Sequence, residues 1–239
     1  EEFLGINSRE TGNKDRLIEK MGICSSILMY VQIEEYTRYR GLRIVNQLIA
    51  QACLTEFKLT YNLSKSEIIL QLLKEDLFYE TSLKKDKLIR DIQTLLITRQ
   101  RKEQGDELDT LFSPLIEAIQ REEKSVESVL KEACTRFKKN ALICQVLARY
   151  FYIKEKKFDL ALIWAKEARR RAPHNSYISD TLGRVFKSQL RYWVDRRVKS
   201  ASLTAEELEH FLDLAQSASQ DFRISQQEAE NEHNERLQC

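Results

Sequence analysis

Glycine and proline are scarce in this chain. Only six glycines and two prolines occur among 239 residues, whereas 42% of the residues are hydrophobic and 32% are charged. Because glycine and proline disfavour helices more than any other residues, this composition, together with abundant Leu, Ile, Lys and Glu, predicts a mostly helical fold. The length is enough for one large domain or two small ones.

Paired cysteines and long apolar runs are also absent. The five cysteines are odd in number and contain no Cys-x-x-Cys pair, which favours reduced, mostly buried thiols in the cytosol or nucleus over disulfides or a zinc site. No stretch approaches the roughly 18 continuous apolar residues of a membrane helix. The chain begins with Glu-Glu-Phe-Leu and not with Met, so we expect a piece of a longer protein without a signal peptide.

Motifs for catalysis are missing as well. The isolated glycines form neither a phosphate-binding loop nor a dinucleotide fingerprint. Three histidines, His174, His210 and His233, lie at no metal-ligand spacing from a cysteine or another histidine. The acidic residues alternate with lysines, as on solvated helix surfaces. We therefore expect no catalytic residue, no metal, no cofactor and no enzymatic activity in this chain.

The first half of the chain predicts a short β-hairpin followed by helices. Residues 27–45 are rich in β-branched and aromatic residues, which favours strands at Ile27–Ile33 and Tyr39–Val45. Ser64–Glu67 has the form of a capping box and predicts the start of another helix. The expected apolar positions of the helices before and after it are Leu48, Ile49, Ala52, Cys53 and Phe57, then Ile68, Ile69, Leu72 and Leu73, and then Leu88, Ile92, Leu95 and Leu96.

The polar stretch Arg99–Asp109 is the candidate domain boundary, which divides the chain into residues 1–109 and 110–239. Beyond it the chain repeats itself: Leu147 and Phe151 recur 35 residues later as Leu182 and Phe186. A helix pair repeating at about 34 residues is the signature of tetratricopeptide repeats, and it predicts an α-solenoid. The expected core of the repeats comprises Leu147, Phe151, Ala161, Trp164, Ala165, Ala168, Leu182 and Phe186.

The repeat register also predicts where units begin and end. Asn140 and Asn175 lie 35 residues apart at the ends of successive units. The spacing of Phe211 and Ala215 matches that of Ala161 and Ala165, but 50 residues later. We therefore expect an insertion of roughly 15 residues within Trp193–Thr204, with Thr204 as the N-cap of the following helix.

Two surfaces of the second half are candidates for binding. The inner helices of such repeats line a concave groove, and the predicted groove set is Gln145, Arg149, Tyr152, Tyr177, Asp180 and Arg184, in which Arg149 and Arg184 should be neighbours. The predicted basic patch consists of Arg169, Arg170, Arg171, Arg191, Arg196, Arg197 and Lys199. The arginines at 169–171 either complement the C-terminal dipole of their helix or contact phosphate or an acidic partner.

Long segments carry a family resemblance: "KMGICSSILMYVQIEEYTRYRGLRIVNQLIA", "TLFSPLIEAIQ", "ICQVLARYFYIKEKKF" and "APHNSYISDTLGRVFKS". They resemble the family of sterile alpha motif domain-containing protein nine and its paralogue, over nearly the whole chain. The resemblance implies a large interferon-responsive, antiviral and growth-restraining protein of the cytoplasm, with endosome association and viral antagonist proteins as partners.

The resemblance further implies a place for this chain downstream of a P-loop NTPase core. Residues 1–109 would then be a winged-helix-like and helical region, and residues 110–239 the tetratricopeptide-like repeats. In many such NTPases a histidine after the second strand senses nucleotide. The matching position here is Asn46, a departure that argues against nucleotide sensing by this segment.

Three functions fit these observations. The leading one is a regulatory and protein-interaction scaffold that relays or restrains the NTPase and effector domains of the same chain and docks protein partners. The alternative is a nucleic-acid-binding module that uses the wing and the basic Arg169–Lys199 region, although the formal net charge of +2 is too small to mark the whole chain as a nucleic-acid or membrane binder. A structural spacer is the third.

Overall fold

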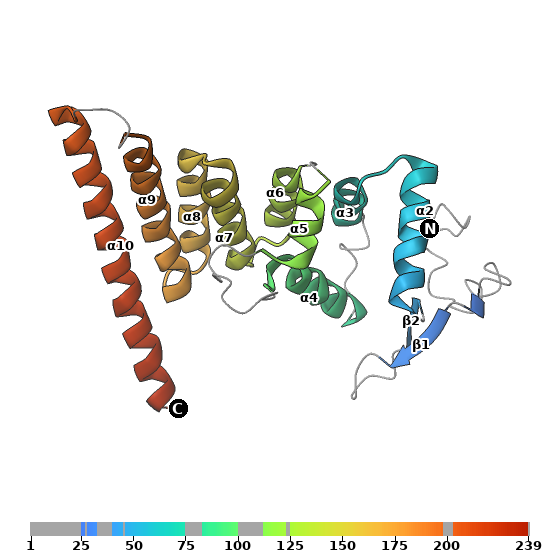
Figure 1. Ribbon diagram of the computed structural model, residues 1–239. Coiled ribbons are helices and arrows are strands. Elements are labelled where there is room, and N and C mark those ends of the chain that lie inside the picture. Colours follow the sequence, from blue (N-terminus) through green and yellow to red (C-terminus); the bar gives the residue numbers. More distant parts are fainter. Residues whose placement is uncertain are drawn as a thin grey trace. The chain divides into compact units, whose positions relative to one another are not determined.

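The computed structural model describes residues 25–26, 28–32, 40–44, 46–74, 83–99, 112–122, 125–197 and 203–238. These residues are mostly helical, as the composition predicts, with helices α2 to α10, one π-helical turn and two strands (Figure 1). The contacts divide the chain into two compact units, Glu1–Leu63 and Ser64–Cys239. Each unit is described by itself.

The described residues of the first unit include a pair of strands and one helix. Strands β1 (Leu28–Gln32) and β2 (Arg40–Ile44) pair antiparallel, with Leu28 opposite Ile44 and Gln32 opposite Arg40. They lie within the two segments that the β-branched and aromatic residues predict, and residues 33–39 between them lie outside the described residues.

Helix α2 (Gln47–Tyr61) has an asparagine at each end. The side chain of Asn46 caps its start, because Oδ1 accepts the Leu48 N–H at 2.7 Å. Asn62 ends the helix with φ of 51°, a left-handed conformation that asparagine tolerates. Two asparagines therefore mark the start and the end of this helix.

The apolar face expected on α2 is not buried by the described residues. Leu48 is 78% exposed, and Ile49, Ala52 and Cys53 are also exposed, while Phe57 is half-buried. The helical spacing was right, but spacing alone does not supply the surface against which such a face packs.

The second unit stacks helices one after another. It comprises α3 (Lys65–Lys74), α4 (Leu83–Ile97), α5 (Pro114–Gln120), α6 (Val126–Arg136), α7 (Ala141–Tyr150) with the π turn η5 (Phe151–Glu155), α8 (Phe158–Arg171), α9 (Ser176–Arg197) and α10 (Ala205–Gln238). From α5 onward each helix contacts the next, and α7 also contacts α9. Contacts between first helices of successive pairs are what an α-solenoid requires, so the arrangement is consistent with one.

The expected repeat core is largely in place. Leu147, Phe151, Ala161, Ala165 and Ala168 are fully buried. Leu182 is 3% exposed, whereas Trp164 and Phe186 are only half-buried. The alanines let neighbouring helices approach closely, and the buried large side chains fill the space that remains between them.

Asn140 and Asn175, which lie 35 residues apart, each cap the start of a helix. Oδ1 of Asn140 accepts the Leu142 N–H at 3.0 Å at the start of α7, and Oδ1 of Asn175 accepts the Ile178 N–H at 3.1 Å at the start of α9. Each satisfies a backbone donor that a helix N-terminus leaves without a partner.

The compact second unit begins earlier than the polar stretch at residue 109. Helix α3 contacts α6, and α4 contacts α5 and α7. Because these contacts join residues 65–97 to the helices that follow, the division lies at Leu63 and Ser64. Ser64 and Glu67 do form the expected capping box: the Ser64 N–H donates to Glu67 Oε2 at 2.7 Å, and the Glu67 N–H donates to Ser64 Oγ at 3.3 Å.

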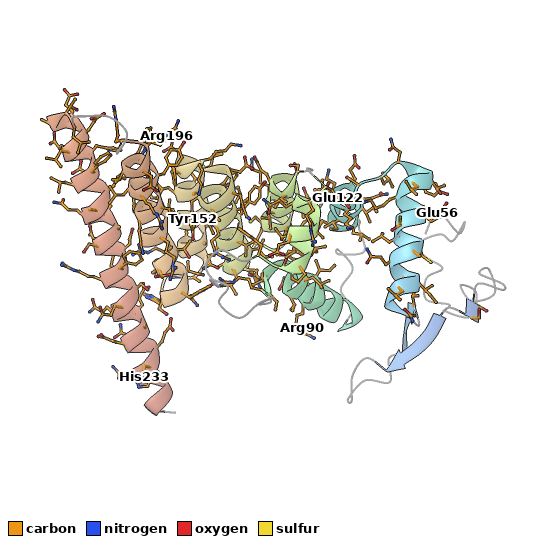
Figure 2. All side chains as sticks on the ribbon, viewed as in Figure 1. Glu56, Arg90, Glu122, Tyr152, Arg196 and His233 are labelled. Carbon is orange, nitrogen blue, oxygen red and sulfur yellow. The ribbon has the colours of Figure 1, made fainter. Side chains whose placement is uncertain are left out.

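An insertion was expected within Trp193–Thr204. Helix α9 continues into this segment as far as Arg197, and residues 198–202 lie outside the described residues. Thr204 caps α10 as predicted, since its Oγ1 accepts the Glu207 N–H at 3.2 Å. Helix α10 runs to Gln238, and His233 lies near its end (Figure 2).

Candidate functional site

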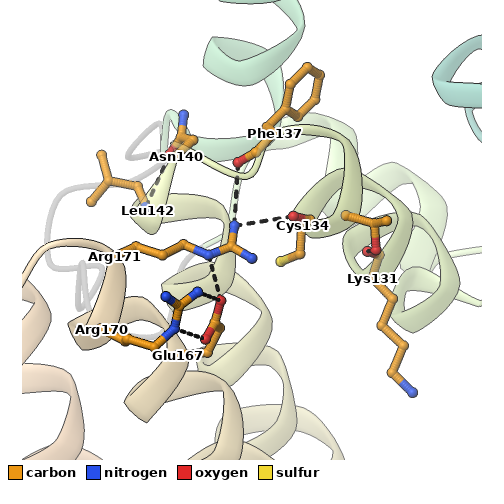
Figure 3. A network of polar contacts seen from close by, with 9 residues as sticks. Lys131, Cys134, Phe137, Asn140, Leu142, Glu167, Arg170 and Arg171 are labelled. Carbon is orange, nitrogen blue, oxygen red and sulfur yellow. Dashed lines mark hydrogen bonds and ion pairs between the residues drawn. The ribbon is translucent and has the colours of Figure 1, made fainter.

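The end of α8 carries the three consecutive arginines of the predicted basic patch. Arg171 is 11% exposed, and its Nη1 donates to the backbone oxygens of Cys134 at 3.1 Å and Phe137 at 3.3 Å (Figure 3). These two carbonyls belong to the last turn and the C-cap of α6. Arg171 therefore caps the C-terminus of α6, whereas the dipole hypothesis concerned the C-terminus of its own helix.

Glu167 holds the arginine cluster together. Its carboxylate accepts from Nε of Arg171 at 2.8 Å and from Nε and Nη2 of Arg170 at 2.8 and 2.9 Å (Figure 3). Hydrogen bonds from Arg170 and then Arg171 lower the pKa of Glu167 from 4.5 to about 2. The carboxylate is thus ionised at any physiological pH and neutralises part of the cluster.

Arg169 faces a different helix. Its Nη1 lies 3.1 Å from Oδ1 of Asp221 on α10, and the Asp221 side chain is 15% exposed. Burial raises the pKa of Asp221, while Arg169 opposes that shift. Arg169 therefore links α8 to α10.

The remaining arginines of the basic patch also have partners. Arg197 forms an ion pair with Glu207, and Arg196 lies over the Tyr192 ring at 5.0 Å from its centroid, at the end of α9 (Figure 2). Arg191 pairs with Asp195 at 3.7 Å, with both side chains highly exposed. Lys199 lies outside the described residues. Each described arginine of the patch has an acidic or aromatic partner, which favours a structural role over phosphate contact.

Half of the predicted groove set lies inside the protein. Gln145 is 3% exposed, and its Nε2 donates to Thr181 Oγ1 at 2.8 Å and to the Tyr177 carbonyl at 3.3 Å. Arg149 and Tyr152 are each 4% exposed. These residues were expected to line an open groove, and that prediction is wrong for this structure.

Arg149 is covered by a ring from an earlier part of the chain. Its guanidinium lies over Phe112, 5.2 Å from the ring centroid, and Phe112 also contacts Tyr150 edge to face. Phe112 is itself 2% exposed. A desolvated guanidinium over an aromatic face is a favourable arrangement.

The other half of the groove set is more accessible. Tyr177 is 42% exposed, and Asp180 and Arg184, which form an ion pair one helical turn apart, are half-buried. The guanidinium of Arg99 lies 5.5 Å from the centroid of the Tyr177 ring. Arg149 packs on Phe112, and Arg184 pairs with Asp180.

Three of the cysteines, Cys53, Cys134 and Cys144, lie among the described residues. Cys134 and Cys144 are buried free thiols, whereas Cys53 is exposed, contrary to the expectation of burial. A hydrogen bond with Cys144, together with burial, raises the pKa of Cys134, so that thiol stays protonated. Within the described ranges, no group of three or more His, Cys, Asp or Glu residues is arranged to hold a metal ion.

Sequence reasoning missed the residues of α10 that hold the start of α9. The Ser176 N–H donates to Oε1 of Glu232 at 2.8 Å, and Oγ of Ser225 donates to the Ser176 carbonyl at 2.8 Å. Both partners lie about 50 residues from Ser176 along the chain, so no local pattern signals them. Asp221, the partner of Arg169, belongs to the same helix.

No family model and no solved structure matches the chain. Among the part of the chain that the structure describes, no helix is long and apolar enough to cross a membrane. Curated proteins do match. The chain is 48% identical to sterile alpha motif domain-containing protein 9-like from Homo sapiens over 234 residues, which are 98% of the chain and 15% of that relative.

Two further relatives agree. Sterile alpha motif domain-containing protein 9 from Homo sapiens is 45% identical over 97% of the chain. The 9-like protein from Mus musculus is 52% identical over 79% of the chain. The chain spans only about 15% of the length of the human relatives that it matches. The segments quoted for their family resemblance lie within this match, which covers nearly all of the chain. The chain therefore belongs to the sterile alpha motif domain-containing protein 9 family.

Proposed function

We propose that this chain is a regulatory and protein-interaction segment of a large signalling protein. It docks other domains of the same polypeptide and protein partners, and it relays or restrains the state of NTPase and effector domains. The observation that carries the proposal is the stack α5–α10, in which each helix contacts the next and the repeated alanines are buried. Stacks of helix pairs present extended surfaces to other proteins.

The finer fold assignment supports the same role. The caps Asn140 and Asn175, 35 residues apart, suit tetratricopeptide-like repeats, and the antiparallel β1–β2 pair followed by α2 suits a winged-helix-like region. Asn46 caps α2 where NTPases of this kind often place a nucleotide-sensing histidine. The cytoplasmic, antiviral setting implied by the family resemblance is part of this proposal.

The alternative, a nucleic-acid-binding module, is less favoured because the described arginines of the basic patch are already paired. Fluorescence anisotropy with RNA and DNA across a salt series separates the two functions. We expect no micromolar binding at low salt, and neither nucleotide hydrolysis nor RNA cleavage by the isolated chain. Salt-sensitive binding that disappears in an Arg170→Glu, Arg191→Glu double variant would establish the alternative, and hydrolysis would overturn both.

A further inference from the structure

Two buried thiols meet beside the turn that joins α6 to α7. Cys134 lies in the last turn of α6 and is 1% exposed, and Cys144 lies in the first turn of α7 and is 0% exposed. Neither is in a disulfide, and the Cys134 thiol donates a hydrogen bond to the Cys144 sulfur. Because a thiol is a short, weak donor, such a bond forms only where the two sulfurs are in direct contact.

Hydrogen bonds on both sides of the turn hold the two sulfurs in this position. Nη1 of Arg171 donates to the carbonyls of Cys134 and Phe137 and fixes the end of α6 (Figure 3). Oδ1 of Asn140 accepts the Leu142 N–H and fixes the start of α7. Each cysteine is therefore anchored through its own helix end, and the folded chain keeps one thiol next to the other.

The two thiols differ in their electrostatic surroundings. The hydrogen bond from Cys134 and, to a smaller extent, the charge of Arg171 lower the pKa of Cys144, although burial opposes them. The same hydrogen bond and burial raise the pKa of Cys134. Since the thiolate is the nucleophile in thiol–disulfide exchange, Cys144 is the thiol that attacks first, and Cys134 is the thiol that follows.

We propose that Cys134 and Cys144 form a reversible disulfide, with oxidised glutathione, a small-molecule disulfide, as the oxidant. The Cys144 thiolate attacks one glutathione sulfur, which forms a mixed disulfide and releases one glutathione thiolate. Cys134 then loses its proton and attacks the Cys144 sulfur, which closes the internal bond and releases the second glutathione. Two protein thiols are oxidised and one glutathione disulfide is reduced to two thiols, so atoms and electrons balance.

The position of the pair at helix ends gives the oxidant a route to it. The connection between the two helices is short, and its Lys138 and Lys139 are exposed. Opening of the last turn of α6 and the first turn of α7 uncovers both sulfurs, and helix ends open more readily than the packed centre of a stack. Once formed, the bond ties α6 to α7. In a reducing compartment the pair stays as thiols, and it closes when oxidised glutathione rises.

The test measures how strongly the fold favours this disulfide. Cys24, Cys53 and Cys239 are replaced by serine so that the pair alone remains. The chain is equilibrated in glutathione redox buffers, with and without urea, and acid-quenched, and its free thiols are alkylated and counted by mass spectrometry. We expect the ratio of disulfide to dithiol to be at least about tenfold higher in the folded chain than in urea, a reduction potential lower by about 30 mV. An equal or smaller ratio in the folded chain overturns the proposal.

A second measurement uses the wild-type chain and needs no substitution. Trypsin cleaves after Arg136, Lys138 and Lys139, so the two cysteines fall in separate peptides that only a disulfide joins. After equilibration with oxidised glutathione under native conditions, we expect this linked pair and its separation by dithiothreitol. Glutathione on both cysteines without a link, or links from either to another cysteine, would refute the site.

Single variants check the order of the two steps. In Cys134→Ser the second step is missing, and we expect Cys144 to remain as a mixed disulfide with glutathione. Cys144→Ser is the matched control, and we expect less glutathione on its Cys134. The reverse ranking contradicts the assignment of Cys144 as the attacking thiol. None of these outcomes depends on the proposed interaction function, which is tested by association with other domains.

Discussion

Three consecutive arginines on one helix have three different environments. Arg169 pairs with Asp221 on α10, Arg170 is 72% exposed beside Glu167, and Arg171 is nearly buried against the end of α6. Helical geometry explains this, because successive residues point about 100° apart around the axis. A run of like charges is therefore a poor guide to a binding site until each side chain is placed.

Replacing Arg171 tests its structural role. Arg171→Ala removes a charged donor from two backbone carbonyls, at a cost of about 2 kcal/mol of unfolding free energy. Urea denaturation measures this loss. Arg170→Ala is the matched control, and we expect it to lower the midpoint much less, because that side chain is 72% exposed and its bonds to Glu167 are screened by solvent. Equal losses in both variants would contradict the assignment.

We expect the Glu167 carboxylate to stabilise the folded chain by an amount that depends on pH. Its pKa is lowered from 4.5 to about 2 in the folded chain, so its contribution is complete above pH 4.5 and is lost as the pH falls toward 2. The stability difference between the wild-type chain and Glu167→Gln should shrink through this window, as measured by urea denaturation at stepped pH. A constant difference would mean that the carboxylate charge contributes nothing.

Helices α9 and α10 approach one another closely, and a glycine allows it. A Cβ at Gly183 would lie 2.8 Å from ring carbons of Phe222, closer than van der Waals contact permits. Nothing in the sequence identifies Phe222 as the partner of Gly183, because the two residues lie in different helices with no shared pattern. This contact is therefore not predictable from the sequence.

Gly183→Ala tests this contact by a change of sign. In the wild-type background the displaced ring outweighs the gain in helix propensity, and we expect a loss of about 1 kcal/mol. In a Phe222→Ala background the space is free, so the same substitution should stabilise by up to about 1 kcal/mol. Thermal and urea unfolding of the four proteins complete a double-mutant cycle. The same effect in both backgrounds would show that Phe222 does not set the requirement for glycine.

Local signals predicted the helix starts at Ser64 and Thr204, whose caps depend on residues within a turn. Asn140 and Asn175 were expected to close repeat units, and they cap the helices that follow. Long-range packing was not predictable. Arg149 is buried against Phe112, and α7 is covered by α4. No periodicity in the sequence relates Arg149 to Phe112, or α7 to α4. Three residues of the candidate groove, Gln145, Arg149 and Tyr152, are buried, while the alanines of the repeat are buried as predicted.

At the scale of the whole molecule, charge and apolar surface are used mainly for internal packing in the described second unit. The described arginines of the basic patch are paired, and half of the groove set is buried beneath other parts of the chain. The chain belongs to a family whose human members are much longer, and our proposal is that it docks other domains of the same polypeptide.

Association with those domains is the most direct test of this account. The chain is mixed with human sterile alpha motif domain-containing protein 9-like from which the matching segment has been deleted, and size-exclusion chromatography with light scattering reports the mass of each species. We expect a one-to-one complex at physiological salt. Separate elution of two folded proteins would contradict the central claim that this segment functions by docking other domains.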